Sequence, residues 1–294
     1  MRNDPFGPAQ TWDDVSRSGR AVPGVDLDAT NESAAAAKPK RAAGVMTMGG
    51  TVQKSLFLLT VCAATAVWAW NMILPFDPET GAHLAQFKMN PWLPIGGGLV
   101  VGLVLALVTI FKPRLAPVTS PFYAAAEGFL LGGLSAFYAA AFALPKGGDD
   151  GLGGMMHANY AIILQAILIT LGITGAMLAV YGTGLVKPGK KFYAGVMAAT
   201  GGVMIVYLIS WIGMLVGFRV PFIHESGLLG IGFSLLVIGI ASMNLILDFD
   251  IIARGVQNRA PKYMEWYGGF TLLVTLVWLY IEVLRLLGKL QSRD

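Results

Sequence analysis

The stretch from Met264 to Lys289, MEWYGGFTLLVTLVWLYIEVLRLLGK, is the last long apolar run of the chain, and it carries charge inside it. Small, polar and charged residues recur in it at steps of three and four: Gly268, Thr271, Thr275, Trp278, Glu282, Arg285 and Lys289. That spacing puts this set, the polar stripe, on one face of a helix. Because the other faces are apolar, the stripe is expected to look inward within a helix bundle. A second reading stays open, in which Glu282 and Arg285 pair near a membrane surface where both reach water.

Composition indicates a protein that crosses a membrane several times. Of 294 residues, 55% are hydrophobic and 13% are charged, whereas about 25% are charged in soluble domains. Seven apolar runs approach the roughly 20 residues needed to cross a bilayer. They span about 54–75, 92–111, 119–144, 159–185, 192–217, 226–249 and 264–288. We therefore predict an all-α membrane domain of seven transmembrane helices over residues 51–290, preceded by a polar, disordered cytoplasmic tail over residues 1–50.

The residues that carry most enzyme and metal chemistry are scarce. Cys62 is the single cysteine, and the three histidines, His83, His157 and His224, fall in predicted loops without metal-ligand spacing. No catalytic motif accompanies them. We expect a protein that is not an enzyme, with no catalytic residues and no cofactor. Nucleic acid is not an expected partner either, because the net charge of +4 is better explained by cytoplasmic loops.

Positive charge predicts the orientation. Lysine and arginine gather before the first run and in the second, fourth and sixth loops: Lys38, Lys40, Arg41, Lys54, Lys112, Arg114, Lys187, Lys190, Lys191, Arg254, Arg259 and Lys262. The alternate loops carry one each, Lys88, Lys146 and Arg219. The N-terminus is therefore expected in the cytoplasm, with the loop around Asp149 and Asp150 outside. Seven crossings would place Arg285, Lys289 and Arg293 on the outer side, against the same rule.

Five carboxylates fall in or beside the predicted helices: Glu127, Asp248, Asp250, Glu265 and Glu282. Charge inside a membrane is costly, so each one suggests a function. With a rise of about 1.5 Å per residue, Glu127 lies roughly 12 Å from the cytoplasmic surface, and Glu282 lies roughly 27 Å along the last helix. Asp248 and Asp250 are predicted to end the sixth helix on the cytoplasmic side.

These depths predict an acidic cluster of Glu127, Asp248, Asp250 and, less directly, Glu265, apart from a Glu282–Arg285 pair towards the other side. Clustered, poorly hydrated carboxylates repel, so at least one is expected to keep its proton to an unusually high pH. Such a cluster could sense pH or bind a cation, with calcium at Asp248 and Asp250 as one reading. Two alternatives stay open: the aspartates lie solvated beyond the helix end near Arg254, and Glu127 only makes a hydrogen bond to a neighbouring helix.

Three segments resemble the bacterial Bax inhibitor-1 family. They are Asn244-LILDFDI-Ile252, Ala260-PKYMEW-Tyr267 and Leu276-VWLYIEVLRL-Leu287, and Glu127-Gly-x-x-Leu-Gly132 is similar to the third helix of that family. The resemblance covers about residues 50–290. It implies a seven-helix fold with the last helix enclosed by the other six. It also implies a multi-pass protein of a bacterial inner membrane.

The resemblance implies a pH sensor made of two aspartates. In the family, an aspartate in the sixth helix, followed four residues later by isoleucine, pairs with an aspartate in the seventh. Asp248 with Ile252 matches the first best, and Asp250 is a near alternative. Family spacing places the second at position 275, which here is threonine, so the paired-aspartate mechanism is in question. Glu127 or Glu265 would then be a substitute partner.

Two functions are expected from this reading. Family members are described as pH-sensitive calcium-leak channels, so the first is a leak for calcium or another cation through intramembrane carboxylates. Oxygen ligands suit calcium. The second is an interaction protein that regulates a membrane protease or another membrane complex, in which the acids serve packing. In both, the lipid bilayer is the immediate partner.

Overall fold

The computed structural model describes residues 44–79, 81–145, 156–215, 217 and 227–292. Within them lie seven long helices: α3 Met48–Ile73, α4 Trp92–Phe111, α5 Ala116–Ala141, α6 Tyr160–Gly182, α7 Lys190–Leu215, α9 Leu228–Gln257 and α10 Met264–Gln291. Each is long and apolar enough to cross a membrane. The predicted all-α, seven-helix fold is confirmed. Residues 1–43 of the predicted tail, the loop around Asp149 and Asp150, and the side chains of Lys146, Arg219, His224 and Arg293 lie outside the described residues.

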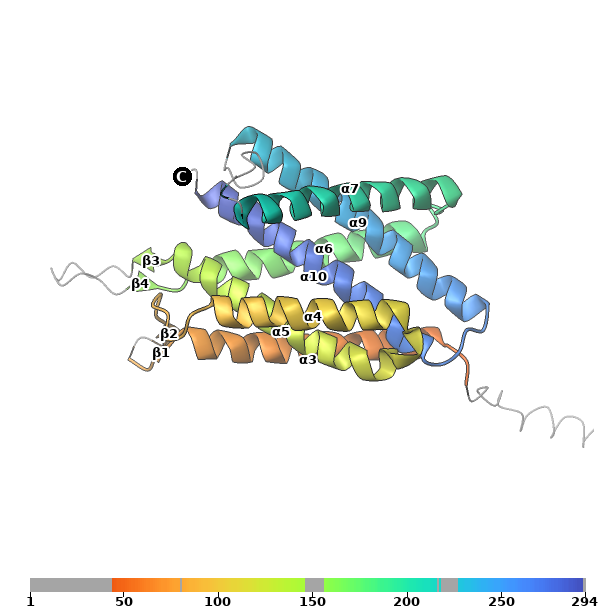
Figure 1. Cartoon of the computed structure of the whole chain (residues 1–294), viewed down its shortest axis with the longest axis horizontal. Helices are drawn as coiled ribbons and strands as arrows, with labels where there is room; N and C mark the ends of the chain where they lie inside the picture. The colour runs from red at the N-terminus through yellow and green to blue at the C-terminus, as the bar shows by residue number, and fades with distance from the viewer. Residues whose placement is uncertain (1–43, 80, 146–155, 216, 218–226, 293–294) are drawn as a thin grey trace, which may run out of the picture. The chain divides into compact units, whose positions relative to one another are not determined.

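Short elements join the helices. Strand β1, Phe76–Asp77, pairs antiparallel with β2, Ala82–His83, and β3, Leu144–Pro145, pairs antiparallel with β4, Met156–His157. A 3₁₀ turn, η1, Pro113–Leu115, precedes α5. Both hairpins lie at the end of the bundle where α10 finishes (Figure 1), and we call this the hairpin end. Helices α3 and α10 both begin at the opposite end.

Two helices extend beyond the apolar runs that predict them. The sixth run ends at about residue 249, but α9 continues to Gln257, so Asp248 and Asp250 lie inside the helix. Asp250 and Arg254, one turn apart, form an ion pair of 2.6 Å that supports this extension. The first helix begins at Met48 rather than near Lys54, because the Thr47 hydroxyl accepts a hydrogen bond from the amide of Gly50 and caps it.

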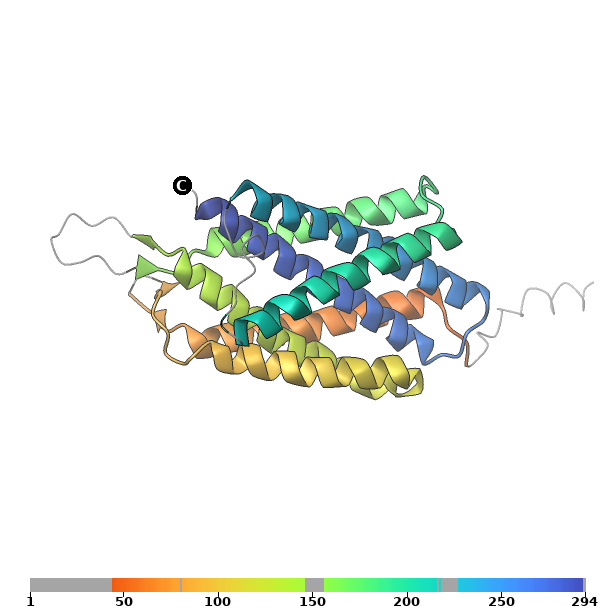
Figure 2. The same ribbon diagram turned by 45° about the horizontal axis from the view of Figure 1, so that its top comes forward.

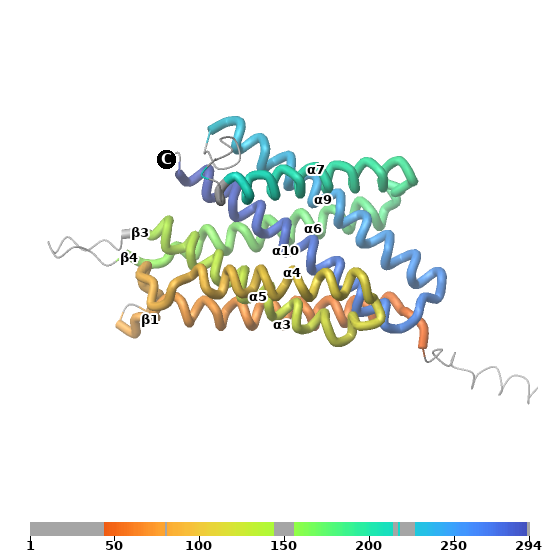
Figure 3. Tube along the Cα trace, viewed as in Figure 1, coloured from red at the N-terminus to blue at the C-terminus, as the bar shows by residue number. Residues whose placement is uncertain are grey.

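Helix α10 is the centre of the bundle. It packs against α3, α5, α6 and α9, and it makes a hydrogen bond to α7 (Figures 2 and 3). Phe270, Leu273, Leu279, Val283 and Leu284 are at most 2% exposed. These apolar side chains therefore lie inside the bundle.

Helices α3 and α5 approach closely because glycine lines their contact. A Cβ added at Gly128 would meet Thr65 Oγ1 and the carbonyl oxygen of Cys62, and one added at Gly132 would meet the carbonyl oxygen of Ala66. Both glycines are on α5, and the atoms that they approach are on α3. The pair Gly128 and Gly132 thus packs as its four-residue spacing predicts.

Candidate functional site

Asp248 joins α9 to α10 through a threonine. Its Oδ2 accepts a hydrogen bond of 2.5 Å from Thr275 Oγ1. Asp248 is 7% exposed and Thr275 is 6% exposed, so the contact lies in the protein interior. The side chain at position 275 is therefore the partner of Asp248, although it is a hydroxyl and not a carboxylate.

Asp250 faces a different set of helices. It accepts hydrogen bonds from Tyr181 of α6, at 3.3 Å, and Tyr193 of α7, at 2.5 Å. Its other partner is Arg254, at 2.6 Å. Because residues two apart on a helix point in nearly opposite directions, Asp250 cannot share the surroundings of Asp248. Asp250 lies beside Arg254, as one sequence reading had it, but it is 7% exposed and inside the helix.

The two remaining acids of the predicted cluster also have their own neighbours. Glu265 is 2% exposed, and its Oε1 accepts from the backbone N–H of Thr47 at 3.0 Å and from the Thr47 hydroxyl at 2.9 Å. Glu127 and Tyr123, one turn earlier on α5, both lie beside Gly102 of α4. The Oε1 of Glu127 would lie 2.8 Å from a Cβ added at Gly102. Thus Glu265 joins the first and last helices, and Glu127 sits where α4 meets α5.

The structure does not bring Glu127, Asp248, Asp250 and Glu265 into one group. Among the described residues, no three histidine, cysteine, aspartate or glutamate side chains gather as metal ligands would. The expected shared cluster is therefore wrong. Depth along a helix does not determine the direction in which a side chain points, so a similar depth does not bring these acids together.

The polar stripe of α10 faces inward, as predicted, and continues from Thr275 towards the hairpin end. Arg285 Nη1 lies 3.0 Å from Glu282 Oε1, and the Tyr207 hydroxyl of α7 donates to the same oxygen at 2.7 Å. Lys289 Nζ donates to the carbonyl oxygen of Gly230, at 2.8 Å, and to Ser234 Oγ, at 3.0 Å, both on α9. Glu282 is 1% exposed, so the reading in which both partners of the pair reach water is wrong.

We call these contacts the polar seam: Asp248–Thr275, Tyr207–Glu282–Arg285 and Lys289 with Gly230 and Ser234. It joins α10 to α7 and α9. Sequence reasoning found the α10 half of the seam from its spacing and missed Tyr207 and Ser234. Each of these has apolar residues on both sides in the sequence, and nothing in its run indicates the helix that it faces.

The fold and the seam define a class, a multi-pass membrane protein whose last helix is held inside the bundle by buried polar side chains. A model of the family described as Bax inhibitor 1 like matches residues 25–292. The chain belongs to this family. The match begins within the segment predicted as a tail. None of the curated proteins compared with the chain matches it.

Proposed function

We propose that this protein is a pH-sensitive leak for cations, calcium among them, in a bacterial inner membrane, with its N-terminus in the cytoplasm. The observation that carries the proposal is the buried Asp248–Thr275 hydrogen bond between α9 and the central helix. A titratable group at this place couples proton uptake to the contact between two spanning helices. The family match supports the choice of function.

Because the partner of Asp248 is a hydroxyl, this contact responds to protonation differently from a pair of carboxylates. Thr275 has one hydroxyl proton and two acceptors nearby, Asp248 Oδ2 at 2.5 Å and the carbonyl oxygen of Thr271 at 3.3 Å. When Asp248 is ionised, the hydroxyl donates to it. When Asp248 is protonated, the carboxyl can donate to Oγ1 while the hydroxyl turns to Thr271. The contact therefore survives in both states, and no repulsion between two charges drives the helices apart.

The driving force for opening must then come from the charge of Asp248 alone. A buried carboxylate without a cation beside it is costly, and water or a cation that enters between α9 and α10 relieves that cost. Carboxylate and hydroxyl oxygens suit calcium. Loss of the Asp248 proton should therefore favour the open state, and the leak should rise with pH.

The test is calcium flux into liposomes that contain only the purified protein, measured from pH 5 to 8. Asp248→Asn should remove the pH dependence. Asp250→Asn is the matched control, because it makes the same change two residues away at the same 7% exposure, where Arg254 compensates the charge. Glu127→Gln and Glu282→Gln should leave the pH midpoint in place, since neither contacts Asp248 or Thr275 in the described contacts.

Thr275→Asp sharpens the test. It places a second carboxylate against Asp248, and two ionised groups at that distance repel, so the flux should depend on pH more steeply than in the wild type. If the wild-type protein gives no flux at any pH, the channel function fails. The regulation of a membrane protease or another membrane complex then becomes the better account of the buried acids.

A further inference from the structure

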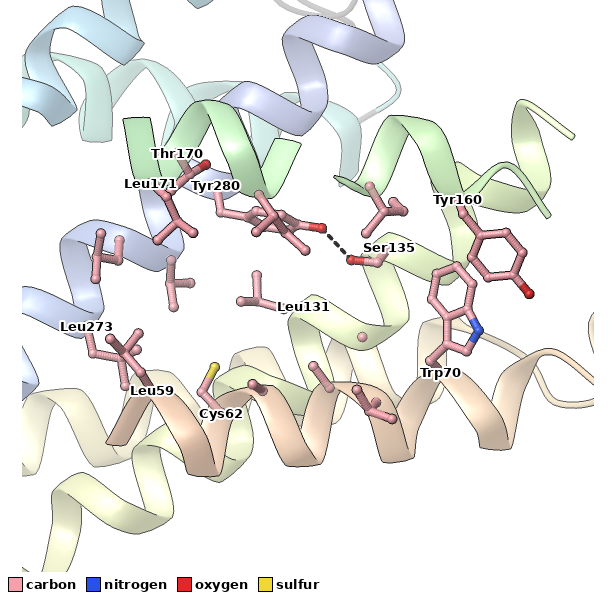
Figure 4. A pocket seen from close by; sticks show the side chains of 18 of the residues that line it. Leu59, Cys62, Trp70, Leu131, Ser135, Tyr160, Thr170, Leu171, Leu273 and Tyr280 are labelled. Atoms are coloured by element: carbon pink, nitrogen blue, oxygen red, sulfur yellow. Dashed lines mark hydrogen bonds between the residues drawn. The ribbon is translucent and has the colours of Figure 1, made fainter. Parts of the chain in front are cut away.

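A cavity of about 650 Å³ lies on the other side of α10, between α3, α5 and α6 (Figure 4). Its inner wall is formed by α10, with Leu273 and Val277 only 2% and 6% exposed. Its surface is almost entirely carbon. Ser135 and Tyr280, which reach it from α5 and α10, satisfy each other with a hydrogen bond of 2.7 Å (Figure 4). A space of this kind is suited to a hydrocarbon and not to an ion.

The cavity opens sideways, where lipid would be. Its rim on α3 includes Val67, which is 62% exposed, and its rim on α6 includes Ile167 and Leu171, which are 42% and 57% exposed. These residues lie within helices that are long and apolar enough to span the membrane, so the medium outside the rim is the acyl-chain region. The cavity is therefore open to lipid chains between α3 and α6, with α10 behind it.

The length of the cavity matches one leaflet. Along α3 the lining residues run from Leu59 to Asn71, and along α6 from Tyr160 to Leu171. At about 1.5 Å per residue these segments are roughly 18 Å and 17 Å long. Half of a hydrocarbon core of about 30 Å is roughly 15 Å. The cavity thus extends from the hairpin end to about the middle of the bilayer.

At the hairpin end of the cavity, polar side chains join its two rims through His83, and we call this contact the His83 bridge. His83 of β2 makes contact with both rims: its Nδ1 lies 2.8 Å from the Tyr160 hydroxyl of α6, and its Nε2 lies 3.1 Å from Asn71 Oδ1 of α3. Because Asn71 Oδ1 only accepts, Nε2 carries the proton and Nδ1 accepts from Tyr160. The Trp70 ring packs against both His83 and Tyr160. Polar and aromatic side chains of this kind mark the interface of a membrane.

We propose that this cavity binds one acyl chain of a phospholipid, taken from the leaflet at the hairpin end, with the glycerol and head group beside the His83 bridge. The chain enters sideways between α3 and α6 and ends against Leu273 near the middle of the bilayer. The bound chain would replace the missing packing on this side of α10.

Charge favours a phospholipid over a free fatty acid. A fatty acid would bring its carboxylate to the polar end of the cavity, and the lining residues include no lysine or arginine to receive it. Burial lowers the pKa of His83, so its ring is neutral at pH 7 and offers no positive charge there. A phospholipid keeps its charged groups in the interface and inserts only hydrocarbon.

The test uses the full chain in phosphatidylcholine vesicles that contain a phosphatidylcholine with a photoactivatable diazirine halfway along one acyl chain. After illumination, mass spectrometry maps the adducts. We expect adducts on Leu273 or Val277 of α10, which annular lipid cannot reach, and a labelled fraction that saturates as the probe is increased. Adducts confined to outward residues such as Leu164 and Leu168 would overturn the proposal.

Ala63 and Ala64 offer a matched pair of variants. Both are exposed on α3, but only Ala63 lines the cavity. Ala63→Phe should reduce α10 labelling about tenfold, because it excludes several methylene groups from the cavity, whereas Ala64→Phe should leave labelling unchanged. Equal labelling in the two variants contradicts the proposal. So does a result in which a photoactivatable palmitic acid labels α10 and the phospholipid does not. A normal elution volume in size-exclusion chromatography shows that each variant is folded.

Discussion

The two sides of α10 are built on opposite principles. Towards α7 and α9, the polar seam fills the contact with hydrogen bonds and an ion pair, and each partner has a defined place. Towards α3 and α6, beyond the Glu265–Thr47 contact, most side chains are apolar and leave a cavity of about 650 Å³ open to the membrane. Buried polar groups must be matched atom by atom because an unmatched one is costly, whereas hydrocarbon tolerates a gap that lipid can fill.

The largest expected effect comes from removing one member of the ion pair in the seam. Arg285→Met leaves Glu282, at 1% exposure, without its counter-ion. The free energy of unfolding should fall by about 3–5 kcal/mol, as when other buried pairs lose one partner. Denaturant unfolding in detergent micelles measures the change. The double variant Glu282→Gln, Arg285→Met should recover much of the loss, and a double variant as unstable as the single one would show that packing and not charge is responsible.

The contact between α3 and α5 should tolerate less added volume than the exposed face of α6. Gly128→Ala puts a methyl group against Thr65 and the carbonyl of Cys62, so it should cost about 1–3 kcal/mol. Gly172→Ala, on α6, is the control because nothing lies within 4 Å of its added Cβ. Alanine also favours a helix over glycine by up to about 1 kcal/mol, so that variant should be equally or more stable than the wild type. Thermal unfolding of both variants in the same detergent compares them, and equal losses would refute a tight α3–α5 contact.

Two threonines compare the sides of α10 directly. Thr275→Val keeps the shape but removes the donor to Asp248, and should cost about 1–2 kcal/mol. Thr170→Val, at the cavity, removes only a bond from the hydroxyl to the carbonyl of Ala166 in its own helix, so its effect should be close to zero. Chemical unfolding of the two variants provides the measurement. A larger loss for Thr170→Val would reverse the comparison.

The smallest effect on stability is expected from His83→Gln, which removes the His83 bridge. Since burial lowers the pKa of His83, the unfolded chain binds a proton at a higher pH than the folded protein does. The contribution of the neutral ring is complete above about pH 7 and is lost as the pH falls below roughly 6.5 and through the lowered pKa. Protonation also removes the acceptor that Tyr160 uses. The difference in thermal midpoint between the wild type and His83→Gln should therefore narrow from pH 7.5 to pH 5, and a difference that does not change with pH would contradict this role.

The contrast between the two sides also explains what the sequence could predict. The seven runs follow from hydropathy alone, and the inward direction of the polar stripe follows from helical spacing, because both are local properties. The partners of the acids are not local. Asp248 and Asp250 are adjacent in any estimate of depth, yet one faces Thr275 and the other faces Tyr193. Threonine cannot ionise, so the family pattern gives no reason to pair Thr275 with Asp248, yet its hydroxyl is sufficient to hydrogen-bond a buried carboxyl group. The sequence does not predict the cavity, because the residues that line it are of the types found in any apolar helix.

The central position of α10 has a consequence for biosynthesis. This helix leaves the ribosome after the five helices that pack or hydrogen-bond against it, α3, α5, α6, α7 and α9. Until it arrives, Asp248, Tyr207 and Ser234 lack their α10 partners. A chain that stops before Met264 should therefore be recognised as incomplete and degraded, even though it contains most of the spanning segments. Degradation of the unfinished protein would then depend on whether this one helix is present.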